Sequence, residues 1–132
     1  MPDSIQIPPN GSSKIVQLYI DGKPVLRAGD GFHRCIFGAA LDEFGIAYGK
    51  IALNKDSSGS DPIMGPARDD GEGGRYKLVG AGSCLRVGKE LIFHSKSRDY
   101  MVGVDREHLE KRCGPEFEKE GLVWELSDLS SF

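Results

Sequence analysis

Hydrophobic and polar residues follow a period typical of strands at the start of the chain. Residues 14–20 form an apolar, β-branched run that ends at Asp21-Gly22, which predicts a strand followed by a turn. Residues 24–28 can pair with this strand as the second arm of a hairpin. The preceding residues, 1–13, are rich in Pro, Ser, Asn and Gly, a composition that predicts a loose N-terminal tail.

The period changes at Phe32 to that of a helix. From there the apolar residues are separated by three, four or five positions, which predicts a helix over about 32–44 with Asp30 or Gly31 near its N-cap. Gly45 stands where a helix-ending glycine is expected. His33 and Arg34 would then lie in the first helical turn, where backbone N–H groups are free and the helix dipole favours anions.

The middle of the chain is predicted to be an extended segment followed by a loop. Residues 46–54 are typical of a strand or extended arm. Residues 55–75 are rich in Gly, Asp, Ser and Pro, which predicts a long surface loop inserted within one domain.

The second half of the chain predicts more strands and one more helix. Apolar runs on both sides of Gly88-Lys89 indicate a hairpin, and residues 122–126 indicate a final strand. Between them, a helix is expected from Asp105 to about Cys113, ended by Gly114-Pro115. The order of elements predicts one α+β or mixed α/β domain over residues 14–132, with one central sheet.

Composition and charge narrow the class of protein. The chain has 132 residues, of which 39% are hydrophobic and 28% are charged, a mixture typical of a globular protein. Its net charge of −3 argues against general nucleic-acid binding, which usually needs a basic face. The sequence has neither a signal peptide pattern nor an apolar stretch long enough for a membrane helix, so we expect a cytoplasmic protein without a membrane partner.

Several common catalytic and metal-binding motifs are absent. The three cysteines are scattered and form no C-x-x-C pair, so reduced thiols are expected instead of disulfides or a zinc site. The C-x5-R motif of cysteine phosphatases, the G-x-S-x-G motif of hydrolases and the H-E-x-x-H metal motif are all missing. A metal site built from cysteines or histidines is therefore not expected.

Three features remain as candidate chemistry: His33, the Gly80–Gly82 stretch and residues 95–100. Each has an ordinary structural explanation. A histidine near a helix start is usually a surface or capping residue, a glycine within a strand usually marks a bulge or a close backbone approach, and a polar run after a strand is usually a loop. None of the three would support a functional hypothesis by itself.

Together, and in this order, these segments resemble the Janus/Ocnus family. The resemblance covers about residues 14–126, with the loop at 55–75 as an insertion. It is carried by residues 32–37 (FHRCIF, similar to Y-H-A-D-I-Y), 78–82 (LVGAG, similar to a strand with G-G-G-R), 90–100 (ELIFHSKSRDY, similar to K-I-x-V-Y-G-Y-S-x-x-Y-G), 13–16 (SKIV, similar to F-K-Y-V), 107–112 and 122–124.

The resemblance implies an α/β (α+β) fold with a mixed central sheet flanked by two main helices. It also implies a metal-independent protein phosphohistidine phosphatase, a hydrolase that needs no cofactor. His33 corresponds to the catalytic histidine, Lys14 to a phosphate-contacting lysine and Ser97 to a phosphate-binding serine. Arg27 corresponds, with a small gap, to a basic residue on the strand before the histidine box. We expect a monomer that acts on a phosphorylated protein or peptide.

The remaining expectations concern the backbone and the arginines. Backbone N–H groups near Gly80 and Gly82 are expected to help cradle the phosphate. Ser83 stands where the family has an arginine, so one phosphate clamp is missing, and Arg98 or Arg86 would have to replace it. Cys35 replaces the family's aspartate, and Met101 replaces the glycine after the aligned tyrosine.

Two other functions stay open at this point. The fold could have kept a phosphate pocket without turnover, as a binding module for a phosphorylated or acidic partner, and the missing arginine favours this alternative. It could also be an interaction protein whose acidic loop, Asp56 to Gly74, is the working surface. The residues do not decide whether His33 would act as nucleophile or general base.

Overall fold

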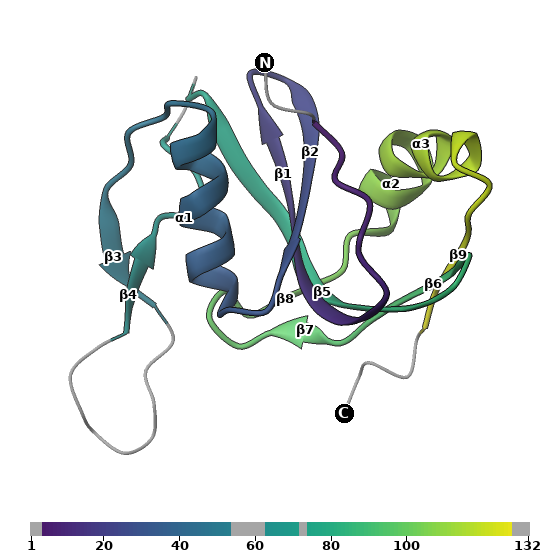
Figure 1. Ribbon diagram of the computed structural model, residues 1–132. Coiled ribbons are helices and arrows are strands. Elements are labelled where there is room, and N and C mark those ends of the chain that lie inside the picture. The colour runs from purple at the N-terminus through teal and green to yellow at the C-terminus, as the bar shows by residue number, and fades with distance from the viewer. Residues whose placement is uncertain (1–3, 54–62, 72–73, 128–132) are drawn as a thin grey trace.

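A five-stranded mixed sheet forms the centre of the computed structural model, which describes residues 4–53, 63–71 and 74–127 (Figure 1). The strands lie in the order β2-β1-β5-β6-β9, and neighbours are antiparallel except β6 and β9, which run parallel. Their bounds are Lys23–Gly29 (β2), Gly11–Ile20 (β1), Tyr76–Val87 (β5), Glu90–His94 (β6) and Val123–Leu126 (β9). The predicted mixed α/β class with one central sheet is confirmed.

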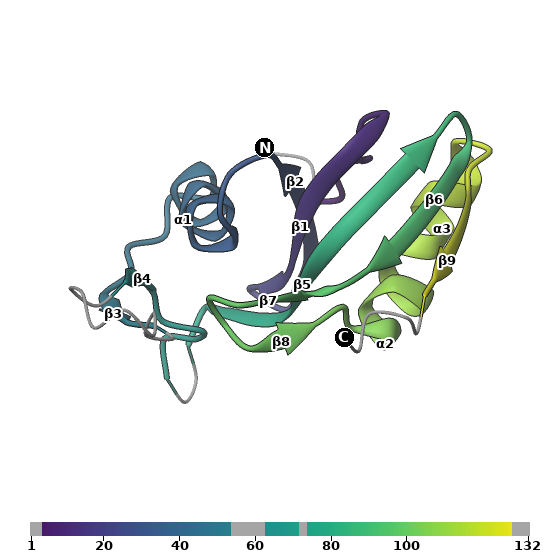
Figure 2. The ribbon, with the colours of Figure 1, turned by 90° about the horizontal axis from the view of Figure 1, so that it is seen from below.

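Helices cover opposite faces of this sheet (Figure 2). They are α1 (His33–Glu43) on one face and, on the other, a continuous run of α2 (Arg106–His108), the π-helical segment η1 (Leu109–Cys113) and α3 (Gly114–Lys119). Successive strand residues point to opposite faces. Val16 and Leu18 therefore join the core beneath α1, whereas Ile15 joins the core beneath the second helical run.

The N-terminal segment is more ordered than the predicted loose tail over residues 1–13. The first strand begins at Gly11, and Ser4 and Gln6 exchange backbone hydrogen bonds with Leu26 along the outer edge of β2. These bonds use only backbone groups, so the Pro-, Ser- and Gly-rich composition does not prevent them. The tail prediction is corrected for the described residues from Ser4 onward.

The middle of the chain contains a second, smaller ribbon. Strands β3 (Lys50–Ala52) and β4 (Met64–Pro66) pair antiparallel, so the predicted extended arm is shorter than expected and the predicted loop contains a strand. Another short ribbon joins β7 (Lys96–Ser97) to β8 (Val102–Gly103). Of the predicted loop, residues 55–62 and 72–73 lie outside the described residues.

The second helical run extends beyond its predicted end. Asp105 caps it as expected, because its carboxylate accepts a hydrogen bond of 2.8 Å from the backbone N–H of His108. Gly114 and Pro115 do not stop it, and the run continues to Lys119. The π-helical segment interrupts the regular ladder just before Pro115, which then occupies the first turn of α3, where its missing N–H is tolerated.

The glycines of β5 mark both a bulge and a close backbone approach. Strand β5 is continuous through Gly80 and Gly82, and its register against β1 shifts between Gln17 and Leu18. A Cβ atom on Gly82 would lie 2.7 Å from the carbonyl oxygen of His94 and 2.5 Å from Val104 Cγ2. The sheet and the segment leading to α2 can meet here because glycine has no side chain.

Within the part of the chain that the structure describes, no helix has the length and apolar character needed to cross a membrane.

Candidate functional site

His33 is the first residue of α1, where it joins the helix to β5. The N-cap is Phe32, one or two positions later than predicted, and its side chain makes no capping hydrogen bond. The carbonyl of Phe32 accepts hydrogen bonds from the backbone N–H groups of Cys35 and Ile36, which starts the helix without a polar cap. The predicted N-cap, Asp30 or Gly31, is therefore wrong, because the first carbonyl to accept a helical hydrogen bond is that of Phe32. Gly45, with φ of +70°, follows the end of the helix as predicted.

One ring nitrogen of His33 is fixed by the sheet. The side chain is only 7% exposed, and its Nε2 atom lies 2.7 Å from the carbonyl oxygen of Gly82. A carbonyl can only accept a hydrogen bond, so Nε2 carries the proton. In a neutral imidazole the lone pair is then on Nδ1.

The surroundings of His33 favour the neutral ring. Burial lowers the pKa of His33 below its ordinary value, while the Gly82 carbonyl opposes this by stabilising the protonated ring. The positive charge of Lys14 lowers the pKa further, and the negative charge of Asp99 raises it. The net shift is downward, so His33 presents an unprotonated Nδ1 at neutral pH.

Two cationic side chains gather at the exposed ring of Phe32. The Nζ atom of Lys14 lies 5.2 Å from the ring centroid, and Cζ of Arg34 lies 4.2 Å from the same centroid. Lys14 comes from β1, on the sheet face that α1 covers, and pairs there with Ser83 of β5. The start of α1 and the middle of the sheet thus hold two positive charges close to His33.

The acidic partner of Arg34 is Asp99, in the turn after β7. Asp99 accepts hydrogen bonds from Arg34 Nη1 at 3.1 and 3.2 Å and from the Arg34 backbone N–H at 3.2 Å. The fully buried hydroxyl of Ser97 accepts a hydrogen bond from the backbone N–H of Tyr100, which holds the turn together. Tyr100 in turn donates its hydroxyl proton to the carbonyl of Pro66 in β4, at 2.8 Å.

Two residues of this segment adopt a backbone conformation that glycine favours. Ser95 has φ of +66° and Met101 has φ of +53°. These are the two positions where the motif K-I-x-V-Y-G-Y-S-x-x-Y-G has glycine. The chain therefore adopts glycine-like backbone geometry there although it carries other residues.

The structure brings together only part of the predicted site. His33 contacts Gly82, Lys14 lies close enough to lower the His33 pKa, and Ser97 stands in the turn that holds Asp99. Arg98 is exposed in that same turn.

Arg27 lies away from His33. Its guanidinium binds the carboxylate of Glu43, at the far end of α1, at 2.8 and 2.9 Å. This pairing does not support phosphate binding by Arg27 beside His33. Gly80 lies in β5 two residues before Gly82, where a Cβ would come within 2.7 Å of the backbone nitrogen of Asp105, and phosphate binding by its backbone N–H stays a prediction.

Sequence reasoning missed Asp99 and Phe32 as members of this group. Asp99 was visible only as one polar residue in a polar run, and Phe32 only as a match to an aromatic position in the motif. The pairing of Arg34 with Asp99 spans 65 positions, so no local pattern could have indicated it.

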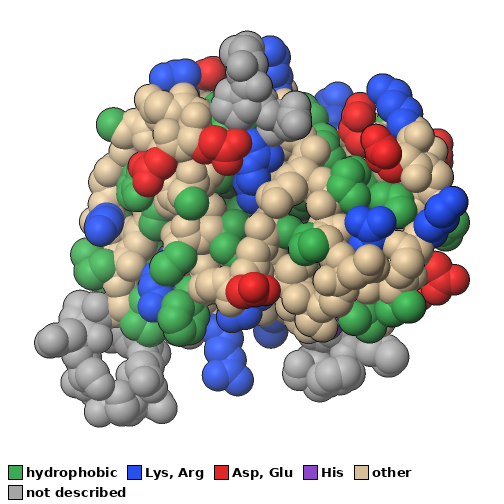
Figure 3. All heavy atoms as spheres, in the orientation of Figure 1, with side chains coloured by type: hydrophobic (Ala, Val, Ile, Leu, Met, Phe, Trp, Pro, Cys, Tyr) green, Lys and Arg blue, Asp and Glu red, His purple; other side chains and the backbone are tan. Residues whose placement is uncertain are grey.

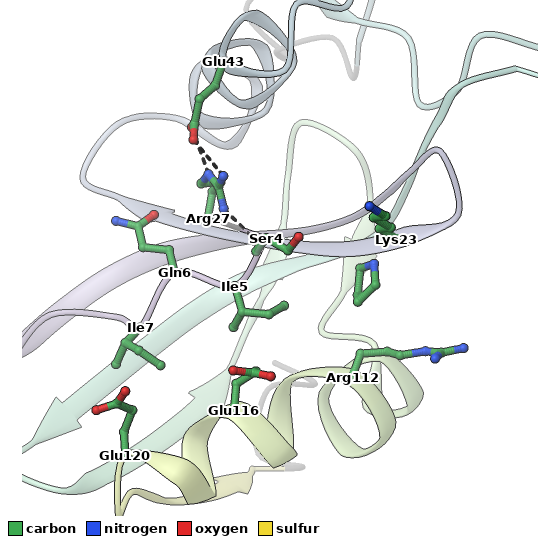
Figure 4. Close-up of a pocket in the computed structure, with 11 residues that line it drawn as sticks. Ser4, Ile5, Gln6, Ile7, Lys23, Arg27, Glu43, Arg112, Glu116 and Glu120 are labelled. Atoms are coloured by element: carbon green, nitrogen blue, oxygen red, sulfur yellow. Dashed lines mark hydrogen bonds and ion pairs between the residues drawn. The ribbon is translucent and has the colours of Figure 1, made fainter. Parts of the chain in front are cut away.

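A cavity of about 830 Å³ lies away from this group, between the N-terminal segment, β2 and the second helical run (Figure 4). Its lining mixes basic Lys23 and Arg112 with acidic Glu116 and Glu120. Mixed charges of this kind do not select for an anion. Figure 3 likewise shows acidic and basic side chains interspersed over one face of the molecule, without a broad patch of one sign.

Among the described residues, no cluster of three or more His, Cys, Asp or Glu side chains could hold a metal ion. The sequence matches no protein-family model and no curated protein.

Proposed function

We propose that this protein is a phosphohistidine phosphatase that hydrolyses a phosphorylated protein or peptide with His33 as its catalytic residue. The observation that carries the proposal is the contact between His33 Nε2 and the Gly82 carbonyl. It fixes the ring and leaves Nδ1 unprotonated, and the positive charge of Lys14 helps to keep the ring neutral by lowering its pKa. A buried, neutral histidine next to a positive charge suits attack on a phosphoryl group.

Hydrolysis needs little covalent chemistry from the protein. Overall, water supplies an oxygen to phosphorus and a proton to the substrate imidazole. The N–P bond breaks, its electron pair stays on the substrate ring nitrogen, which takes that proton and leaves as neutral imidazole, and inorganic phosphate is released. Nδ1 of His33 either takes the proton from the attacking water or attacks phosphorus itself, after which water hydrolyses the phosphorylated His33. In both routes Lys14 offsets the negative charge of the phosphoryl oxygens.

Backbone geometry adds support for the family resemblance. The motif that residues 90–101 resemble has glycine at two positions, and glycine is the residue that most easily adopts a positive φ. This chain has a positive φ at both of those positions, Ser95 and Met101. Local sequence favours neither residue in this conformation. The agreement supports a common chain path through residues 90–101.

A binding module without turnover is the second candidate. Ser83 replaces the arginine of the resembled family and lies opposite Lys14 on the sheet, so the phosphate site has lost one clamp. If catalysis depends on that clamp, the protein would bind phosphohistidine without cleaving it. The comparison of turnover with affinity separates the two candidates.

The test is dephosphorylation of a phosphohistidine peptide in the presence of EDTA, by the wild type and by His33→Ala. We expect release of phosphate by the wild type, loss of turnover in the variant, and partial recovery when imidazole is added. Circular dichroism and the melting temperature show whether the variant is folded. Turnover by a folded His33→Ala protein at the wild-type rate would overturn the mechanism.

A further inference from the structure

We propose that Arg34 is the second phosphoryl-binding cation of this site, in place of the arginine that Ser83 does not supply. The inference rests on the proposed function, which it extends by naming a substrate-binding residue. The family motif quoted above has alanine at the position of Arg34, so the resemblance does not suggest this role.

The first argument is the way in which the Arg34 guanidinium is held. Only Nη1 is bound by the Asp99 carboxylate, and the Phe32 ring lies against the group at 4.2 Å. Among the described residues, Nε and Nη2 of Arg34 have no hydrogen-bond partner. These two nitrogens form the edge of the guanidinium that binds two oxygens of a phosphate at once.

The second argument is where the charge is needed. The transition state of phosphoryl transfer spreads negative charge over three oxygens, which one lysine cannot contact in a directed way. Arg34 follows His33 in the chain and shares the Phe32 ring with Lys14. Its side chain is 22% exposed, so an incoming anion can reach it.

The third argument is that the other arginines proposed from the sequence are less suitably positioned to bind a phosphoryl group at His33. Arg86 donates to the carbonyls of Gly88 and Pro8 toward the hairpin end of β5. Arg27 is bound to Glu43. Arg98 is exposed, and no hydrogen bond, ion pair or ring contact with another described residue fixes the direction of its side chain.

Asp99 acts in this arrangement as a positioning residue. Its carboxylate binds both the Arg34 backbone N–H and Nη1, so it fixes the side chain relative to the start of α1. An arginine fixed before the substrate arrives loses less conformational entropy on binding.

The experiment compares kcat/KM for a phosphohistidine peptide among the wild type, Arg34→Ala and Arg34→Lys. Loss of charge-assisted hydrogen bonds should lower kcat/KM by about 10- to 100-fold in Arg34→Ala. The decrease should be smaller in Arg34→Lys, which keeps the positive charge but cannot form two parallel hydrogen bonds to the phosphoryl group. The matched control is Arg75→Ala, which also removes an arginine paired with an aspartate, Asp21, but on another part of the surface. We expect the control to retain wild-type kcat/KM.

A second variant restores the missing arginine. Ser83 lies on the same sheet face as Lys14, so Ser83→Arg would place a guanidinium beside that lysine. We expect the double variant Arg34→Ala/Ser83→Arg to recover at least tenfold over Arg34→Ala, and a folded Arg34→Ala protein with wild-type kcat/KM would overturn the proposal.

Binding of inorganic phosphate, measured by calorimetry, separates the two proposals. A wild type without turnover and without phosphate binding overturns the proposed function and this inference with it. An active wild type whose phosphate affinity is unchanged in Arg34→Ala overturns this inference alone. Weaker binding in Arg34→Ala, but not in Arg75→Ala, supports it.

Discussion

The Nε2 atom of His33 lies 2.7 Å from the carbonyl oxygen of Gly82, across 49 positions of sequence. This one contact connects the start of α1 to the central strand β5 and determines which ring nitrogen of His33 is free. Because Gly82 has no side chain, β5 can also meet the segment that follows β6 at this point. The site therefore depends on a glycine that does not itself take part in chemistry.

Activity should depend on pH through His33. Its pKa is lowered from 6.5, chiefly by burial, and only the unprotonated ring can accept a proton or attack phosphorus. We expect kcat/KM to be constant at neutral pH and to fall on acidification with a midpoint below 6.5. Initial rates corrected for spontaneous hydrolysis measure this profile. A midpoint above 6.5 would contradict the neutral, buried histidine.

Replacing Gly82 by alanine should damage both stability and the site. The new Cβ would meet the carbonyl oxygens of His94 and Ser95 at 2.7 and 3.0 Å, and backbone cannot move aside cheaply. We expect a loss of about 1–3 kcal/mol in the free energy of unfolding. The matched control is Gly49→Ala, because a Cβ there meets nothing within 4 Å. Equal stability of the two variants in urea denaturation would show that the close approach is unimportant.

Lys14→Met should weaken substrate binding more than it affects folding. The side chain is half-buried beside Phe32, and methionine keeps much of its apolar length while removing the charge. We expect a higher KM and a higher pKa for His33, because the Lys14 charge lowers that pKa. Peptide kinetics and NMR titration of the His33 ring measure the two effects. Lys77→Met, at an exposed position of β5, serves as the control.

Stability should decrease on acidification because of a second buried histidine. His108 is fully buried; its Nε2 donates to the Leu18 carbonyl, and its Nδ1 lies within hydrogen-bond distance of the Gln17 amide and the Cys113 thiol. Burial lowers its pKa below 6.5, so the unfolded chain takes up the proton first as pH falls.

The free energy of unfolding is thus expected to be constant above pH 6.5 and to decline below it, toward the lowered pKa of the folded state. His108→Gln should be less stable at neutral pH by about 1–3 kcal/mol because it loses buried hydrogen bonds. It should also show a shallower decline with acid, although His33 contributes a decline of the same sign. Urea denaturation of both proteins across this pH range measures the slopes, and identical slopes would exclude His108 as a source.

Much of the fold could be predicted from local pattern. The β-branched run of β1, the Gly88-Lys89 turn and the spacing of apolar residues in α1 are local signals, and the structure confirms the elements they predict. The predicted stop at Gly114-Pro115 was wrong because the π-helical segment ends just before them, so that Pro115 occupies the first turn of α3, where a missing N–H is tolerated.

Less of the candidate site than of the fold could be predicted from the sequence. His33 and Gly82 could be named from short motifs, but the atoms that join them could not. Arg34 and Asp99 meet only after the β6–β7 region folds back against α1, a tertiary contact with no local signal. Arg27 was assigned to the site from the resemblance alone, and its pairing with Glu43, across 16 positions of sequence, is a tertiary contact with no local signal.

The most direct test of the central proposal is to measure affinity and turnover separately for the wild-type protein. A phosphohistidine peptide is titrated under conditions of slow turnover, and phosphate release is then followed with EDTA present. We expect turnover that saturates with the peptide and exceeds spontaneous hydrolysis by orders of magnitude. Tight binding of the peptide by folded protein, with phosphate release no faster than the spontaneous rate, would contradict the enzyme and establish the binding module.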